Sequence, residues 1–214
     1  MSSVSMRQHL LEKSNCSYFA CTKSTKDDPV LRCRQMQFIV LPDLEELLDT
    51  TPVEPYPCHR KTEEELNDPF ILLHTSGTSS TTGNPKLVSY SLGYAASSQL
   101  HQYGPDQDGR VNYMKNISSC SRAYTAFRTS HAGGVFLFYK LMYAGTAVLL
   151  GGDDPLSLQT VEAVLDHGNI ETAFFPPITL EAIVRSPRLL AKLCQQKLVT
   201  YAGGMPPPVI ALLP

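Results

Sequence analysis

Apolar and polar positions alternate along the chain in two kinds of block, short apolar runs and longer amphipathic stretches. The short runs predict strands at residues 37–41, 70–74, 86–91, 146–150, 172–175 and 198–202, the first of them buried. The stretches between them predict helices at residues 92–102, 134–143, 158–167, 178–184 and 188–194. Because strands and helices alternate, the pattern predicts an α/β fold with a mostly parallel sheet flanked by helices.

The first 35 residues show no clear periodicity and mix Ser, Lys, Asp and Cys. We therefore expect residues 1–35 to form a poorly ordered or loosely packed segment, and residues 36–214 to form the folded domain. Asp43 and Glu46 have the spacing of a capping box, which predicts a helix start. Three prolines within residues 50–57 predict a connector.

Composition excludes several classes of protein. Of the 214 residues, 43% are hydrophobic and 18% are charged, which is typical of a globular chain and not of a disordered one. The net charge is −2, from 18 basic and 20 acidic residues without a long basic run, so we expect no nucleic-acid partner. The most apolar run, residues 135–150, contains Lys140 and is shorter than the ~20 residues of a membrane helix, so we expect no membrane partner.

Cysteine usage and the N-terminus bear on metal binding and location. The six cysteines form no C-x-x-C pair, so we expect no structural metal site. Arg7, Gln8 and His9 stand where a secretory signal needs apolar residues. We therefore expect a cytoplasmic protein with reduced thiols.

One segment carries most of the chemical information: residues 73–86, which read L-H-T-S-G-T-S-S-T-T-G-N-P-K. Glycines let backbone N–H groups turn toward a ligand, hydroxyls add donors, and Lys86 adds positive charge, which together favour a phosphate cradle. A flexible polar connector is the alternative, since such clusters often only join elements. The segment is not a Walker loop, because five residues separate Gly77 from Gly83 and the lysine comes three later.

The same segment resembles the phosphate-loop signature of adenylate-forming enzymes, T-S-G-[ST]-T-G-x-P-K. Residues 75–78 and 82–86 match it in order, and His74 precedes it as in the fungal nonribosomal-peptide-synthetase-like group, which includes carboxylate reductases. Further matching stretches are L-P-D-L at 41–44, H-A-G-G at 131–134, P-P at 176–177 and Y-A-G-G-M-P at 201–206. The resemblance covers residues 36–214, which would be part of the large N-terminal subdomain of such an enzyme.

The resemblance implies ATP-dependent activation of a carboxylic acid as an acyl-adenylate, with ATP and Mg²⁺ as cofactors. The residues that would hold the β and γ phosphates are Thr75, Ser76, Gly77, Thr78, Thr82, Gly83 and Lys86. His131 would lie near the acid, and Gly203 and Gly204 against adenine or substrate, although a purely structural role stays open at all three. The aromatic residues that could contact the acyl group or belong to the core are Phe136, Phe138 and Tyr139.

The implied partners are a carboxylic acid and, in a longer parent protein of fungal secondary metabolism, carrier or reductase domains.

Two departures from the family pattern bear on whether the chain is active. Three extra residues, 79–81, lengthen the phosphate loop, and the chain stops before the family's Y-G-x-T-E segment, its ribose-binding aspartate and its C-terminal domain with the catalytic lysine. We therefore expect the isolated chain to be poorly soluble and inactive in pyrophosphate exchange. The alternative is a non-catalytic nucleotide-binding or interaction module, as a degenerate copy or gene-model fragment.

Overall fold

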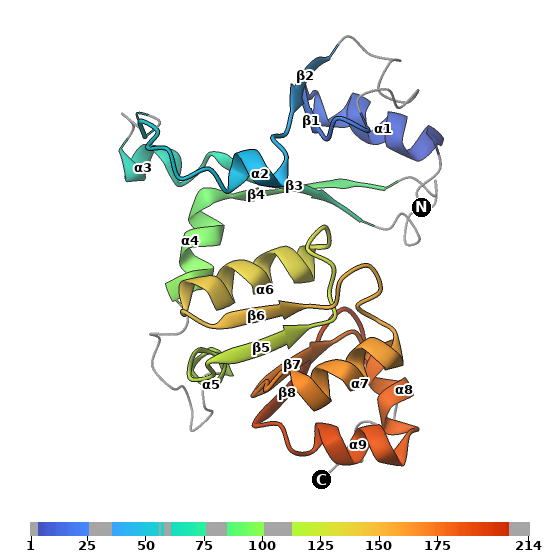
Figure 1. The fold of residues 1–214 in the computed structure, drawn as a ribbon. Coiled ribbons are helices and arrows are strands. Elements are labelled where there is room, and N and C mark those ends of the chain that lie inside the picture. Colours follow the sequence, from blue (N-terminus) through green and yellow to red (C-terminus); the bar gives the residue numbers. More distant parts are fainter. Residues whose placement is uncertain are drawn as a thin grey trace. The chain divides into compact units, whose positions relative to one another are not determined.

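The structure, a computed structural model, describes residues 4–25, 36–55, 57, 61–75, 85–100 and 113–205. The chain divides into two compact units, Met1–Gly93 and Tyr94–Pro214 (Figure 1). Each unit has its own sheets, and helix α4 (Leu92–Leu100) begins at the end of the first. In the described ranges, no helix combines the length and the hydropathy needed to cross a membrane.

The first unit contains two small two-stranded sheets. Strand β1 (Tyr18–Cys21) pairs in parallel with β2 (Gln37–Val40), and β3 (Pro69–His74) pairs antiparallel with β4 (Leu87–Ser91). Helices α1 (Val4–Ser14), α2 (Leu44–Leu47) and α3 (Thr62–Glu65) complete the unit. Residues 1–35 thus contain, in their described part, a helix and a strand that the apolar pattern did not predict.

The start of α2 confirms the capping box. The Asp43 carboxylate accepts from the Glu46 N–H at 3.1 Å, and the Glu46 carboxylate accepts from the Asp43 N–H at 3.0 Å. The hydrogen bond from the Glu46 N–H lowers the pKa of Asp43, as does the Lys23 ammonium 3.0 Å from its carboxylate. The cap therefore satisfies donors that a helix end leaves without partners.

The second unit contains one four-stranded sheet in the order β6-β5-β7-β8, with every pair parallel. Its strands are β5 (Arg122–Thr125), β6 (Ala147–Leu150), β7 (Thr172–Phe175) and β8 (Leu198–Tyr201). Its helices are α5 (Tyr113–Ser118), α6 (Ala132–Tyr143), α7 (Leu158–His167), α8 (Pro177–Val184) and α9 (Pro187–Leu193). The predicted α/β fold with a mostly parallel sheet is confirmed.

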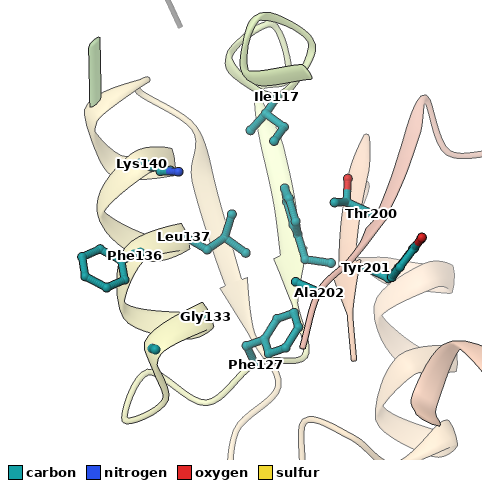
Figure 2. A pocket seen from close by; sticks show the side chains of 11 residues that line it. Ile117, Phe127, Gly133, Phe136, Leu137, Lys140, Thr200, Tyr201 and Ala202 are labelled. Carbon is teal, nitrogen blue, oxygen red and sulfur yellow. The ribbon is translucent and has the colours of Figure 1, made fainter. Parts of the chain in front are cut away.

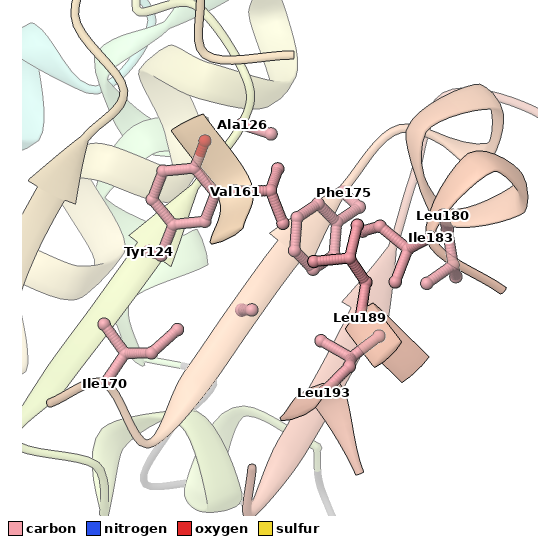
Figure 3. Packing of buried hydrophobic residues seen from close by; sticks show 10 residues of the cluster. Tyr124, Ala126, Val161, Ile170, Phe175, Leu180, Ile183, Leu189 and Leu193 are labelled. Atoms are coloured by element: carbon pink, nitrogen blue, oxygen red, sulfur yellow. The ribbon is translucent and has the colours of Figure 1, made fainter. Parts of the chain in front are cut away.

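The central strands are buried on both faces, as parallel strands between helices must be. Phe174 and Ala123 pack with Leu141 of α6, whereas Phe175 and Tyr124 pack against α7, α8 and α9. Figure 3 shows the second cluster, in which side chains of α8 and α9 surround Phe175. Burial raises the pKa of Tyr124 to about 12, with a smaller contribution from Asp154, and its hydroxyl donates to the Pro155 carbonyl.

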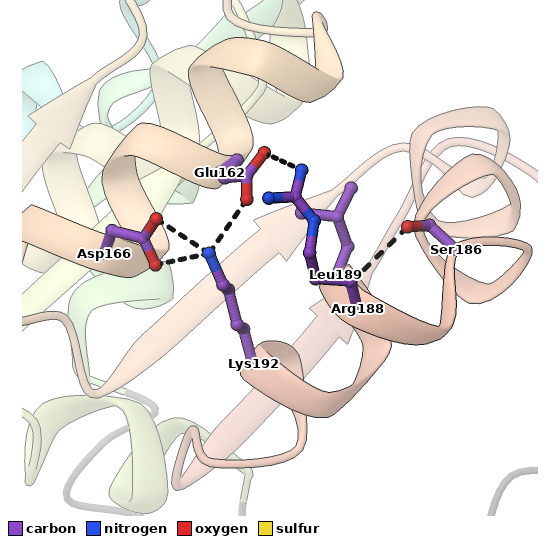
Figure 4. Close-up of polar contacts among 6 residues, drawn as sticks. All are labelled: Glu162, Asp166, Ser186, Arg188, Leu189 and Lys192. Atoms are coloured by element: carbon purple, nitrogen blue, oxygen red, sulfur yellow. Dashed lines mark hydrogen bonds and ion pairs between the residues drawn. The ribbon is translucent and has the colours of Figure 1, made fainter.

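An ion-pair network joins α7 to α9 over this core (Figure 4). The Lys192 ammonium lies 2.8 Å from the Glu162 carboxylate and 2.6 Å from that of Asp166, and Arg188 also pairs with Glu162. These contacts raise the pKa of Lys192, and the hydrogen bond from Lys192 lowers the pKa of Asp166. The network links α7 to α9 on the face of the sheet that these helices cover.

Candidate functional site

The polar segment singled out in the sequence connects the antiparallel strands β3 and β4. Strands β3 and β4 pair up to His74 and Leu87, and two further hydrogen bonds close the loop behind them. The Thr75 N–H donates to the Lys86 carbonyl, and the Lys86 N–H donates to the Thr75 hydroxyl, both at 3.0 Å. Thr75 and Lys86 therefore lie side by side, although ten residues separate them in the sequence.

The remaining phosphate-loop candidates, Ser76, Gly77, Thr78, Thr82 and Gly83, lie outside the described residues. Pro85 is buried and Lys86 is exposed, so the proline anchors the strand start while the lysine side chain faces solvent. The Thr75 hydroxyl accepts the hydrogen bond from the Lys86 N–H, so it contributes to the pairing of these two residues.

In the second unit, the sheet order has a topological switch point, where a crevice is expected at the carboxyl ends of the strands. Strands β5 and β7 are neighbours, but β5 continues into α6 on one face and β7 into α8 on the other. In open parallel sheets, ligands bind outside the carboxyl ends of the strands at such a switch point. The segments just after β5, β7 and β8 therefore border this crevice.

His131 lies at this crevice as the N-cap of α6. Its Nδ1 accepts from the Gly133 N–H at 3.2 Å, so Nε2 carries the proton in the neutral ring. The imidazole stacks on Phe127, with ring centroids 6.3 Å apart and an interplanar angle of 25°. Sequence reasoning left open a structural role for His131, and the cap supplies one without engaging Nε2.

Gly203 and Gly204 follow directly after the end of β8, in the same region of the second unit. Gly203 has φ +98°, a conformation that favours glycine, and a Cβ built there would lie 3.9 Å from the Phe127 ring. A Cβ on Gly204 would lie 3.9 Å from Pro177 at the start of α8. Two candidate site residues, His131 and Gly203, therefore lie against Phe127, which the sequence analysis had not identified.

A cavity of about 260 Å³ extends from this point between α6 and the sheet (Figure 2). It is mostly apolar and lined by Ile117, Phe127, Ala132, Gly133, Phe136, Leu137, Lys140, Phe174, Thr200, Tyr201 and Ala202. Of the aromatic candidates, Phe136 lines the cavity, whereas Phe138 and Tyr139 are outside its lining and pack edge-on against each other. Its volume lies just below the about 300 Å³ at which ligand pockets of proteins typically begin.

Lys140 is the one charged residue among the described residues that line the cavity. Burial lowers its pKa, and no charged or hydrogen-bonding neighbour in the described ranges offsets that effect. The sequence already marked Lys140 as unusual, because it interrupts the apolar run 135–150. For metals, no group of three or more His, Cys, Asp or Glu side chains that could hold an ion occurs in the described part of the chain.

Residues 3–212 match the family model described as AMP-binding enzyme. The chain belongs to this family. The match begins at residue 3, so it includes most of residues 1–35 as well as the candidate site.

Two curated fungal proteins are similar to this AMP-binding chain. The isocyanide synthase-NRPS hybrid crmA of Aspergillus fumigatus is 30% identical over 94% of the chain, and the carboxylic acid reductase of Neurospora crassa is 28% identical over 94%. The chain spans only 14% and 19% of the lengths of these relatives.

Solved structures of the adenylate-forming class share the fold. A malonyl-CoA ligase complex with methylmalonyl-CoA and AMP has a TM-score of 0.68 at 18% identity, over 97% of this AMP-binding chain and 40% of its own. The Bacillus subtilis o-succinylbenzoate coenzyme A synthetase with ATP and magnesium has a TM-score of 0.67 at 18% identity, over 98% and 39%. An adenylation domain of a keto acid-selecting NRPS module has a TM-score of 0.68 at 13% identity, over 98% and 37%.

Proposed function

We propose that this chain holds the nucleotide and the acid in an adenylate-forming enzyme that activates a carboxylic acid with ATP. The observation that carries the proposal is the closed hairpin of the first unit. The Thr75–Lys86 pairing brings both ends of the matching phosphate-loop signature together, in a chain that belongs to the AMP-binding family.

Lys86 supports the phosphate part of this proposal. Lys86 is exposed, and in the described ranges its ammonium makes no ion pair, so a phosphate can become its partner. The proposed phosphate-binding set is Thr75, Ser76, Gly77, Thr78, Thr82, Gly83 and Lys86. Magnesium prefers phosphate oxygens and water over an all-protein cage, so the absence of an acidic cluster in the described part of the chain is compatible with it.

In this proposal, residues of the second unit bind the acid and the adenine. Gly203 and Gly204 present open backbone after β8, which lets a flat ring approach. His131 keeps its Nε2 proton for a carboxylate or phosphate oxygen, because Nδ1 is fixed by the Gly133 N–H. Attack of the carboxylate on the α-phosphorus breaks the bond to pyrophosphate, and fixed donors of this kind stabilise the charge that develops.

The relatives support a proposal about context. Their names describe an NRPS hybrid and a carboxylic acid reductase, and the chain spans a small part of each. We infer that it works beside carrier or reductase domains in fungal secondary metabolism.

A titration with ATP and magnesium tests the phosphate assignment. The substitution Lys86→Ala should weaken ATP binding about 10- to 100-fold, because a hydrogen bond to a charged group contributes about 1.5–3 kcal/mol. Lys61→Ala, which removes a lysine of the same unit that makes no side-chain cap at α3, should leave the affinity unchanged. Equal affinities of the chain and Lys86→Ala would refute the role of Lys86.

A further inference from the structure

The wall of the cavity in the second unit contains a charged residue, Lys140, which binding of a simple fatty or aryl acid does not require. Its wall on the α6 side carries Gly133, Leu137 and Lys140 at intervals of four and three residues, which places them on one helix face. Figure 2 shows the Lys140 chain leaving α6 on the same side as Leu137, toward the strands.

The surroundings of this ammonium are apolar. Ile117, Leu141 and Phe174 are almost fully buried around the same face of the sheet. Burial lowers the pKa of Lys140, and no carboxylate of the described residues pairs with it. Lys140 is partly buried, and an ammonium beside apolar side chains gains from a partner that compensates its charge.

The distance along the helix sets the length of a compensating ligand. Gly133, beside Phe127 and His131, and Lys140 are seven residues apart, which is about 10 Å along the axis. A molecule whose reacting carboxylate lies at the His131 end would bring its far end to the Lys140 ammonium.

We propose that Lys140 makes this cavity selective for acids that carry a second carboxylate, which the ammonium binds at the end far from His131. The inference rests on the proposed acid-binding function and deepens it by naming the substrate class. Lys140 is then a specificity-determining residue, and a bound carboxylate would favour its charged form.

A matched pair of acids tests the proposal on the 214-residue chain. Calorimetric titration should give an affinity for adipate about tenfold higher than for hexanoate, which has the same number of carbons and one carboxylate, because one charge-assisted contact is added. Lys140→Met should abolish this preference by weakening adipate binding. Lys140→Arg should retain most of it, since the positive charge remains.

Two controls separate selectivity from folding. Arg185→Met removes an exposed charge of the same unit outside the cavity lining and should keep the preference for adipate. Ligand-free Lys140→Met should melt at the same temperature as the parent chain or higher, because an uncompensated ammonium is removed.

Equal affinities for the two acids in the parent chain, no binding of either acid, or an adipate preference that survives Lys140→Met would each overturn the proposal. The ATP titration on the same protein distinguishes this failure from failure of the proposed function. If ATP binds through Lys86 but adipate is not preferred, only the selectivity is wrong. If adipate is preferred but ATP does not bind, the selectivity stands and the activation of acids by ATP does not.

Discussion

At the scale of single residues, Gly134 determines how the candidate site is built. A Cβ on this residue would lie 2.0 Å from the Arg128 carbonyl oxygen, far inside any allowed contact. The absent side chain lets the first turn of α6 pack onto the segment that follows β5. That packing positions Phe127 and His131 at the crevice.

We predict that Gly134→Ala lowers the free energy of unfolding by about 1–3 kcal/mol or more, because the backbone of residues 128–131 must move. Urea denaturation checks this result. Gly133→Ala is the matched control, since its Cβ would meet the Phe127 ring at an ordinary 3.4 Å and alanine favours helix. If the two variants were equally stable, the close approach at Gly134 would not matter to the fold.

At the scale of secondary-structure elements, Glu171 ties the amino ends of three strands together. Its carboxylate accepts from the Ser121 N–H and hydroxyl before β5 and pairs with Lys197 before β8. Its own backbone bonds to Arg122 and Lys197. These contacts, led by the Lys197 hydrogen bond, lower the pKa of Glu171 from 4.5 to about 2.

This shift predicts a pH dependence of stability. A carboxyl whose pKa falls on folding stabilises the protein above its unfolded pKa, so the contribution is complete above about 4.5 and is lost as the pH falls toward 2. We predict that Glu171→Gln lowers the melting temperature at pH 7 and that the difference shrinks at pH 3. Asp153→Asn, an exposed carboxylate of the same unit, should show no such convergence. A difference that is constant with pH would contradict the role of Glu171.

The elements differ in how far the sequence predicts them. Helix α7 and strand β7 have the predicted bounds, because Ser157 and Gly168 mark the helix ends and the apolar pattern is unambiguous. Strand β5 was missed although it is central, since its four residues, R-A-Y-T, follow a polar segment and show no apolar run. The antiparallel pairing of β3 and β4 was not predicted either, because two strands joined by a loop need no crossover helix.

The candidate site, too, could be predicted from the sequence only in part. The phosphate-loop ends, His131 and the two glycines after β8 came from linear motifs, which a sequence displays directly. Phe127 and the cavity position of Lys140 did not, because they follow from the order β6-β5-β7-β8, which places segments distant in the chain side by side.

At the scale of the whole molecule, the described residues combine buried clusters in the second unit with exposed apolar side chains in both units. The second unit has two buried clusters on opposite faces of its sheet. In the described part of the first unit, Leu44, Leu48 and Val53 are 69%, 68% and 89% exposed. Exposed apolar surface of this kind promotes association, so poor solubility of the isolated chain stays a prediction.

The central claim is that one chain holds both the nucleotide and the acid, and a single ligand can test it. An adenosine 5′-(N-acylsulfamate) links the two groups through an uncleavable bond that imitates the acyl-adenylate. We predict that it binds the chain at least about tenfold more tightly than AMP or the free acid, because linking makes the second contact intramolecular. Calorimetric titration of the three ligands under the same conditions gives the comparison. An acylsulfamate that binds no more tightly than AMP would contradict the claim that the chain holds both the nucleotide and the acid.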